Sequence, residues 1–506
     1  MAQPAAGHRS IFSGSPLMAP AWELIALGCL VVFYLLAEEV LGRDSIDLCN
    51  YMGPVVLMVV LTLGALRMVL LEAASIWLAL FWFRVSAGVY YGAGALVPLL
   101  TTDSMRLHLD SFFSFTDEFL AKANLVWALG ISTVLLTANV YAAFKGRGVA
   151  FRERSAGASD GKVMLVVGLM LLGVGSVAKY FFIMPYMFGL LSYTLPGAVG
   201  PLAYCSYAAM FLLTAWSLEH SRLSFGLIVG LLLVEMLGGF LMMTKNEVLM
   251  PLIMFLLAFI RQRATVTRLG VIGAAISAVF IAIIPVVDYG RNQLWSLYRT
   301  TVGVGIGVRL EIIQQGLEGD AWNTASTSDV QAGWVRISYA NQSTFAIHLY
   351  DSGRPSESLE HLFAVFIPRF LWPEKPNITD IGLDFNFMAS GISTSASSPG
   401  LFAEAYWIAG WSGVVLLMIP TGFVLAVLSS YALDLMRREQ WLYFPVVLLG
   451  MRVGLRTDGY FVVDIVGGSV ILVATYLIFV GLDQVVRVWF RPSAQRPSRA
   501  LRSINK

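Results

Sequence analysis

A polar stretch of 111 residues, 288–398, concentrates groups that bind anions in a chain otherwise rich in apolar residues. It carries seven basic residues, eleven acids and the histidines His348 and His361. The planar guanidinium of arginine donates two parallel hydrogen bonds to a phosphate. This stretch and its flanks therefore predict phosphate binding, and the candidate pyrophosphate ligands are Lys245, Arg291, Lys375, Arg452 and Arg456. The alternative left open for each basic residue of the stretch is an ion pair with one of its acids.

The segment 367–376, with the sequence Ile-Pro-Arg-Phe-Leu-Trp-Pro-Glu-Lys-Pro, is the most informative part of this stretch. Its three prolines forbid a continuous helix and favour a rigid, extended backbone. Such a backbone would hold Arg369 and Lys375 in defined directions, as a binding site requires. We expect Arg369 to act in catalysis. Trp372 between them would stack on a sugar ring or, alternatively, anchor the loop at the membrane interface.

A hydroxyl-rich segment, 390–400, then leads into an apolar run that begins Leu-Phe-Ala-Glu-Ala-Tyr at position 401. Glu404 lies near the predicted start of a helix, where the helix dipole favours a carboxylate. Burial there would make Glu404 a general base, with His348 as a second candidate. The alternative for Glu404 is a helix-capping role. Tyr406 is the second candidate sugar-binding residue.

The composition shows which elements must position these groups. Of 506 residues, 57% are hydrophobic and 13% are charged, and the formal net charge is +2. Soluble proteins carry about 25% charged residues, and so many apolar side chains cannot be hidden in a water-soluble globule of this size. The composition excludes a soluble enzyme, a disordered chain and a nucleic-acid binder that works by bulk charge. It predicts a multi-pass membrane protein.

We expect an all-α polytopic membrane protein with about twelve transmembrane helices, because lipid offers the backbone no hydrogen-bond partners. The polar stretch should be a partly helical periplasmic loop, with one short helix ending near Ile313 and a second between Val330 and Phe345. The apolar runs lie at about 22–41, 51–71, 73–99, 119–144, 162–182, 196–216, 223–243, 247–260, 268–287, 403–430, 441–457 and 460–482.

Basic residues follow alternate spans, as the positive-inside rule requires if both termini are cytoplasmic. We therefore expect a cytoplasmic N-terminus (1–21), nine spans (22–287), the outer loop (288–398), three spans (399–482) and a basic cytoplasmic tail (483–506). Within the spans, Glu235 is a candidate buried charge, and we expect Arg84 as its partner. The outer cations then lie beside the outer leaflet, where a lipid-linked pyrophosphate is the obvious anion.

Several motifs together resemble the bacterial oligosaccharide repeat-unit polymerases (Wzy-type, acting in O-antigen and exopolysaccharide synthesis), which are related to the O-antigen ligases. The specific part is Pro-Arg-Phe-Leu-Trp-Pro-Glu-Lys-Pro at 368–376, the Ser-rich segment, Ala-Glu-Ala-Tyr at 403–406 and Gly-Trp-Ser-Gly at 410–413. Phe83-Arg84, Tyr90-Tyr-Gly92 and Thr244-Lys245 also fit. Asn246 departs from the family, which usually has glycine there.

The resemblance implies a GT-C-like bundle and a glycosyltransferase of the bacterial inner membrane that needs no metal or other cofactor. It would transfer a growing glycan from undecaprenyl pyrophosphate to a newly flipped, lipid-linked repeat unit. The implied partners are the lipid-linked donor and acceptor, the bilayer and a chain-length regulator, with no nucleic acid. The predicted cations would stabilise the charge that grows on the pyrophosphate leaving group.

Two rival functions stay open on the sequence. An O-antigen ligase differs from a polymerase only in its acceptor, so the sequence separates the two poorly. A secondary transporter, including a lipid-linked oligosaccharide flippase, is also compatible with twelve spans and two cytoplasmic ends. Such carriers usually show two matching halves with the long loop between them, whereas here the long loop follows the ninth predicted span.

Overall fold

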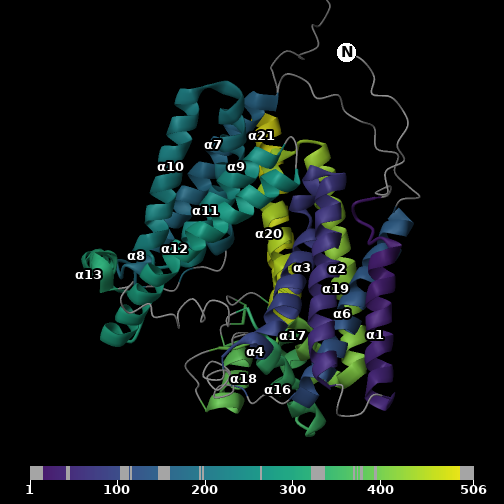
Figure 1. Ribbon diagram of the computed structural model, residues 1–506. Helices are drawn as coiled ribbons and strands as arrows, with labels where there is room; N and C mark the ends of the chain where they lie inside the picture. Colours follow the sequence, from purple (N-terminus) through teal and green to yellow (C-terminus); the bar gives the residue numbers. More distant parts are fainter. Residues whose placement is uncertain are drawn as a thin grey trace, which may run out of the picture.

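The computed structural model shows an all-helical chain in the part that it describes (Figure 1). The described residues are 15–40, 46–102, 113, 117–145, 160–192, 195, 199–261, 265–320, 337–367, 371–372, 374–376, 380–391 and 396–489. The helices of the N-terminal half are α1 (Ala21–Val40), α2 (Ile46–Leu71), α3 (Ala79–Ala87), α4 (Val97–Leu100), α6 (Asp117–Lys145), α7 (Asp160–Ser176), α8 (Met184–Met187), α9 (Val199–His220) and α10 (Arg222–Leu241). Those that follow are α11 (Lys245–Leu257), α12 (Val266–Tyr298), α13 (Ile306–Gln315), α16 (Ala340–Asp351), α17 (Leu362–Phe366), α18 (Asp380–Ser390), α19 (Leu401–Arg437), α20 (Phe444–Leu455) and α21 (Gly468–Trp489).

Eight helical segments of the described chain are long and apolar enough to cross a membrane. Two shorter apolar helices, Ala21–Ala37 and Trp441–Leu455, accompany them. This confirms the multi-pass, all-helical class. The eight segments are Leu48–Leu71, Phe119–Lys145, Met164–Met187, Val199–His220, Arg222–Leu241, Val266–Tyr298, Leu401–Arg437 and Phe461–Gly481.

The remaining two apolar runs form shorter or interrupted helices. Between Ala73 and Leu100 the chain passes through a 3-10 turn, α3, a π-helical turn at Gly88–Ala93, a second 3-10 turn and α4. The other run forms α11 and the 3-10 turn Ala258–Ile260, called η6. A tight turn ahead of Thr244 sends α11 back along α10, with which it packs.

Helix α19 is the central element of one half of the bundle, where it packs along α6 and contacts α3, α16 and α20. It is broken at Ala409–Gly410, and Gly410 has a φ of +61°. A side chain at Gly410 would be strained by this φ and would also meet the ring of Tyr350. The Gly-Trp-Ser-Gly motif at 410–413 therefore marks a kink in this helix.

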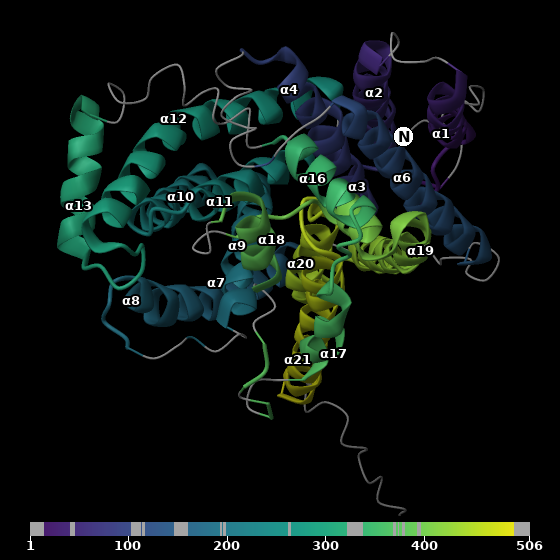
Figure 2. The ribbon, with the colours of Figure 1, turned by 90° about the horizontal axis from the view of Figure 1, so that it is seen from below.

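Most of the described outer loop gathers at one end of the bundle, called here the loop end, where α16, α17 and α18 lie together (Figure 1). Seen from this end, α16 and α18 lie across the ends of the longer helices (Figure 2). Helices α13 and α16 coincide with only part of the two predicted loop helices, and α12 continues to Tyr298, eleven residues beyond the expected end of its span at 287. The first residues of the predicted loop are therefore helical. Val330 and Trp334 of the second pattern lie outside the described residues.

Candidate functional site

The turn 456–460, which joins α20 to the π-helical turn Phe461–Gly467 (η10), forms the charged centre of the candidate site. Arg456 lies 3.6 Å from Asp458 Oδ2 and 3.4 Å from Asp464 Oδ1. Asp464 also accepts a hydrogen bond of 2.9 Å from the backbone N–H of Tyr460. A Cβ on Gly459 would lie 1.9 Å from Asp464 Oδ2, so only glycine permits this close approach. The side chain of Arg456 is 40% exposed, which leaves it able to meet a ligand.

Three elements far apart in the sequence hold this turn in place. The Thr457 carbonyl accepts hydrogen bonds from the Leu401 N–H (2.9 Å) and from the Tyr91 hydroxyl. The Thr457 hydroxyl lies 2.8 Å from the hydroxyl of Ser86 on α3. The turn is therefore joined to α3, to the π-helical turn after it and to the start of α19. It is a fixed part of the bundle.

Glu404 lies beside this turn and is fully buried. One carboxylate oxygen accepts a hydrogen bond of 2.9 Å from the Ser358 hydroxyl, and the other accepts one from the backbone N–H of Phe461. These two bonds join α19 to η8 (Ser358–His361) and to η10. The geometry gives Glu404 a positioning role, because it orients the residue that follows the charged turn.

Asp458 is the carboxylate of the turn whose environment is best suited to proton transfer. Burial raises the pKa of Asp458, and Asp464 raises it further, against the opposing effect of Arg456. The Tyr339 hydroxyl lies 3.5 Å from its Oδ2 oxygen. Its Oδ1 oxygen is buried and has no hydrogen-bond partner among the described residues. A buried polar atom without a partner is rare in folded proteins, which makes Asp458 an unusual carboxylate.

An apolar groove of about 390 Å³ runs along the bundle next to this turn. It begins at Phe461, whose N–H binds Glu404, and extends along α21 to Val473. Pro420 and Val424 of α19 form its opposite wall, and Phe366 of α17 borders it. Most of its lining belongs to predicted spans, so the groove has the chemistry of a site for a hydrocarbon chain.

The candidate sugar-binding residue Tyr406 and the candidate base His348 do not belong to the charged turn. Tyr406 is buried, and its hydroxyl donates a hydrogen bond of 3.0 Å to Asp351 Oδ1. Lys122 lies 2.6 Å from the other oxygen of Asp351 and 5.1 Å from the centre of the Tyr406 ring. His348 is exposed on α16, with its ring against the edge of Phe119.

The described pyrophosphate candidates other than Arg291 contact different kinds of groups: carboxylates, backbone carbonyls or an aromatic ring. Lys245 pairs with Asp288 at 2.8 Å. Lys375 donates hydrogen bonds of 3.0 and 2.9 Å to the carbonyls of Ala364 and Ile367, so it caps the end of α17. Arg452 lies 5.6 Å from the centre of the Tyr204 ring.

Arg291, like Arg452, is exposed. Trp372 is 40% exposed, which is compatible both with stacking on a sugar and with anchoring the loop at the membrane interface. Arg369 lies outside the described residues.

The expected pairing of Glu235 with Arg84 is wrong. Arg84 forms a buried ion pair of 2.7 Å with Glu23. Glu235 instead pairs with Lys179 at 2.7 Å, and Glu247 lies 3.1 Å from the same lysine. The prediction failed because it considered only the charges that hydropathy had singled out. Lys179 lies inside the apolar run 162–182, so the mean hydropathy of that run does not reveal it.

Sequence reasoning missed Asp458, Asp464 and Ser358. The signal for the two aspartates was present, because the segment Arg-Thr-Asp-Gly-Tyr-Phe-Val-Val-Asp places both within eight residues of Arg456. No sequence signal marks Ser358, whose role depends on how α16 and α17 return to α19. Comparisons of the chain with protein-family models, curated proteins and solved structures give no match.

Proposed function

We propose that this chain is a membrane glycosyltransferase that polymerises oligosaccharide repeat units carried on undecaprenyl pyrophosphate. The observation that carries the proposal is the position of the apolar groove beside the charged turn 456–460, whose Arg456 is paired with Asp458 and Asp464. A lipid-linked sugar has the same two parts, a hydrocarbon chain and a charged head. The motifs shared with repeat-unit polymerases support the same assignment.

In this proposal the bundle has about twelve spans in a GT-C-like arrangement. The loop end faces the periplasm, both termini are cytoplasmic, and the membrane is the bacterial inner membrane. Newly flipped repeat units would then reach the loop end directly. The alternation of basic residues along the sequence supports this orientation.

The reaction assigns one task to each described group of the turn. The lipid chain of the donor lies in the groove, and Arg456 binds the pyrophosphate. An acceptor hydroxyl forms a bond to the anomeric carbon of the donor sugar while the bond from that carbon to the pyrophosphate oxygen breaks. The electron pair of that bond leaves with the pyrophosphate, whose growing charge Arg456 stabilises. Asp458 takes the proton of the acceptor hydroxyl, and Glu404 holds Phe461 and the turn in position.

In vitro polymerisation with purified protein and lipid-linked repeat units tests the proposal. We expect a ladder of products that differ by one repeat, and we expect its loss in Asp458→Asn and Arg456→Ala proteins. Arg222→Ala is the matched control, because Arg222 is exposed at the first residue of α10, away from the turn. Full activity of both turn variants would overturn the assigned site. Transfer of glycan only to a lipid core would identify a ligase instead.

A further inference from the structure

A second cavity, of about 560 Å³, lies at the opposite end of the bundle from the charged turn. Arg261 on its border stacks on Trp441, which follows the far end of α19. The cavity is formed by the end of α9, the end of α11 with η6, and the start of α12. Its lining residues are Ala215, Leu218, Glu219, Leu256, Ala258, Phe259, Arg261, Thr267, Arg268, Val271 and Ile272.

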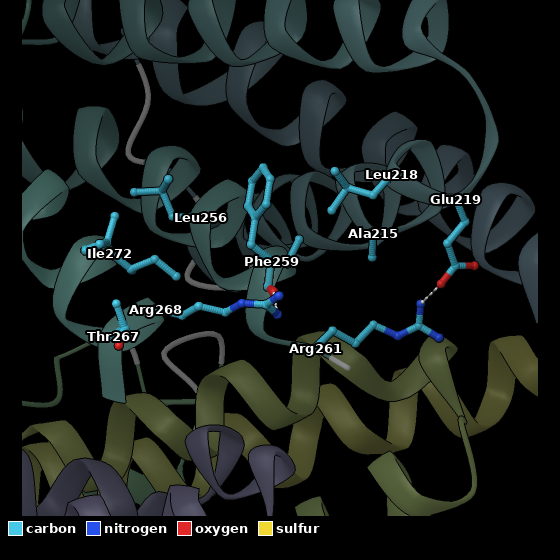
Figure 3. A pocket seen from close by; sticks show the side chains of 11 residues that line it. Ala215, Leu218, Glu219, Leu256, Phe259, Arg261, Thr267, Arg268 and Ile272 are labelled. Carbon is cyan, nitrogen blue, oxygen red and sulfur yellow. Dashed lines mark hydrogen bonds and ion pairs between the residues drawn. The ribbon is translucent and has the colours of Figure 1, made fainter. Parts of the chain in front are cut away.

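The lining is divided into an apolar and a basic part (Figure 3). Leu218, Leu256 and Phe259 lie along one border, and Thr267, Arg268 and Arg261 lie along the other (Figure 3). A small soluble anion would use only the basic border. A ligand that uses both must have an apolar chain attached to an anionic group.

The guanidinium of Arg261 is held in a fixed direction. It donates a hydrogen bond of 3.0 Å to Glu219 Oε1, and it lies 5.4 Å from the centre of the Trp441 ring. Arg268 donates a hydrogen bond of 3.4 Å to the carbonyl of Phe259, which joins it to η6. Two arginines and one glutamate give the lining a net charge of +1, which favours an anion.

The cavity also borders the lipid-facing surface. Val271, one of its lining residues, is 64% exposed, and Val266 at the start of the same helix is 56% exposed. On the neighbouring α10, Leu223 is 78% exposed. Apolar side chains this exposed on predicted spans face hydrocarbon. In the orientation proposed above, which the basic loops of the sequence support, this end lies at the cytoplasmic leaflet.

We propose that this cavity binds one anionic phospholipid of the cytoplasmic leaflet. The phosphate lies between Arg261 and Arg268, and an acyl chain lies against Leu256, Phe259 and Ile272. Basic pockets between helices on the cytoplasmic side of membrane proteins recognise anionic lipid headgroups in this way. The site rests on the orientation proposed above and is independent of the proposed glycosyltransferase activity. Because Arg261 also contacts Trp441, the lipid would stabilise the contact between the α9–α12 helices and the link from α19 to α20.

The test measures thermal unfolding of the purified full-length protein in detergent with added palmitoyl-oleoyl phosphatidylglycerol, and counts bound lipid by native mass spectrometry. Palmitoyl-oleoyl phosphatidylcholine and inorganic phosphate are the comparison ligands. We expect phosphatidylglycerol alone to raise the unfolding temperature and to remain bound. Each of Arg261→Gln and Arg268→Gln should weaken its binding about tenfold, since one charge-assisted contact is lost.

Two variants control for charge and folding. Arg222→Gln removes a positive charge at the same end outside the cavity, and it should leave phosphatidylglycerol binding unchanged. Glu219→Gln raises the lining charge to +2 and should tighten binding, a gain that a misfolded protein would not show. Equal stabilisation by phosphatidylcholine or by phosphate would overturn the proposal. So would unchanged phosphatidylglycerol binding in the double variant Arg261→Gln/Arg268→Gln.

Discussion

Replacing Arg456 separates its proposed role in leaving-group stabilisation from its role in holding the turn. Its guanidinium lies 3.6 Å from Asp458 and 3.4 Å from Asp464, and its side chain is 40% exposed. Ion pairs with this much solvent contact are worth about 0.2–1 kcal/mol each, so losing both costs at most about 2 kcal/mol of stability. A positioned group that stabilises transition-state charge contributes about 2.7–4 kcal/mol, or roughly 100- to 1,000-fold in rate.

The two magnitudes make the prediction specific. Arg456→Ala should lower the rate of polymerisation per folded molecule by roughly 100- to 1,000-fold. The unfolding temperature should fall by no more than about 8 °C, since 1 kcal/mol shifts it by about 2–4 °C in domains of 150–250 residues. The rate of Arg456→Lys should lie between those of the unsubstituted protein and Arg456→Ala, because lysine keeps the charge and loses the planar fork of donors.

The assay follows ladder formation from purified lipid-linked repeats, and scanning fluorimetry on the same preparations measures folding. Arg222→Ala, at the other end of the bundle, sets the effect of losing an exposed positive charge. A rate in Arg456→Ala equal to that of the control would refute the reasoning. A loss of activity that only matched a loss of folded protein would show that Arg456 holds the turn and does no more.

Four further predictions concern the buried polar groups. Glu404→Ala removes the acceptor for the Phe461 N–H and should lower the free energy of unfolding by about 1–3 kcal/mol. Glu404→Gln should lower it less, and equal unfolding temperatures of the two variants would contradict this. Lys179→Met leaves the buried Glu235 with the Tyr180 hydroxyl but without its ion-pair partner and should cost about 3–5 kcal/mol, partly restored by adding Glu235→Gln. Arg309 is buried and donates to four backbone carbonyls, so Arg309→Lys should lose about 1.5–3 kcal/mol and speed proteolysis near α13; unchanged cleavage would argue against it. The raised pKa of Asp458 means that a general base there loses its proton only above the ordinary aspartate range, so polymerisation should fall as pH decreases through this raised value. Asp458→Asn should abolish this acid limb together with most of the rate, whereas an unshifted limb would assign the base elsewhere.

Hydropathy predicted the helices well because each span must satisfy its own backbone in lipid, which imposes a long apolar run on the sequence. It failed at the end of α12, which extends to Tyr298 through polar residues. A helix that leaves the membrane no longer needs apolar side chains, so its end does not coincide with the change in polarity. The kink at Gly410 was visible only as a motif, because the Tyr350 ring that a side chain there would meet belongs to another helix.

The position of Glu404 beside the charged turn could be expected in part, because the sequence places Glu404 and Arg456 at the same end of the bundle. Its two hydrogen bonds could not be expected. Ser358 and Phe461 lie 46 and 57 residues away, and a hydroxyl and a backbone N–H carry no signature of the carboxylate that they bind. The aspartates of the turn were overlooked for a different reason. Only cations were considered as phosphate ligands, so the two aspartates that orient Arg456 were left out.

The partners of the buried cations narrow the choice of ligand-binding residues further than the sequence can. Arg84 is neutralised by Glu23, 61 residues away, and Arg309 is bound by backbone carbonyls. Such side chains are already committed to the fold, and a sequence cannot reveal this because their partners lie on other helices or belong to the backbone. A cation that binds a ligand must combine exposed surface with a fixed direction. Arg456 meets both conditions, since two aspartates orient it while 40% of its side chain stays exposed. Arg452, exposed and stacked on Tyr204, is the next candidate by the same criterion.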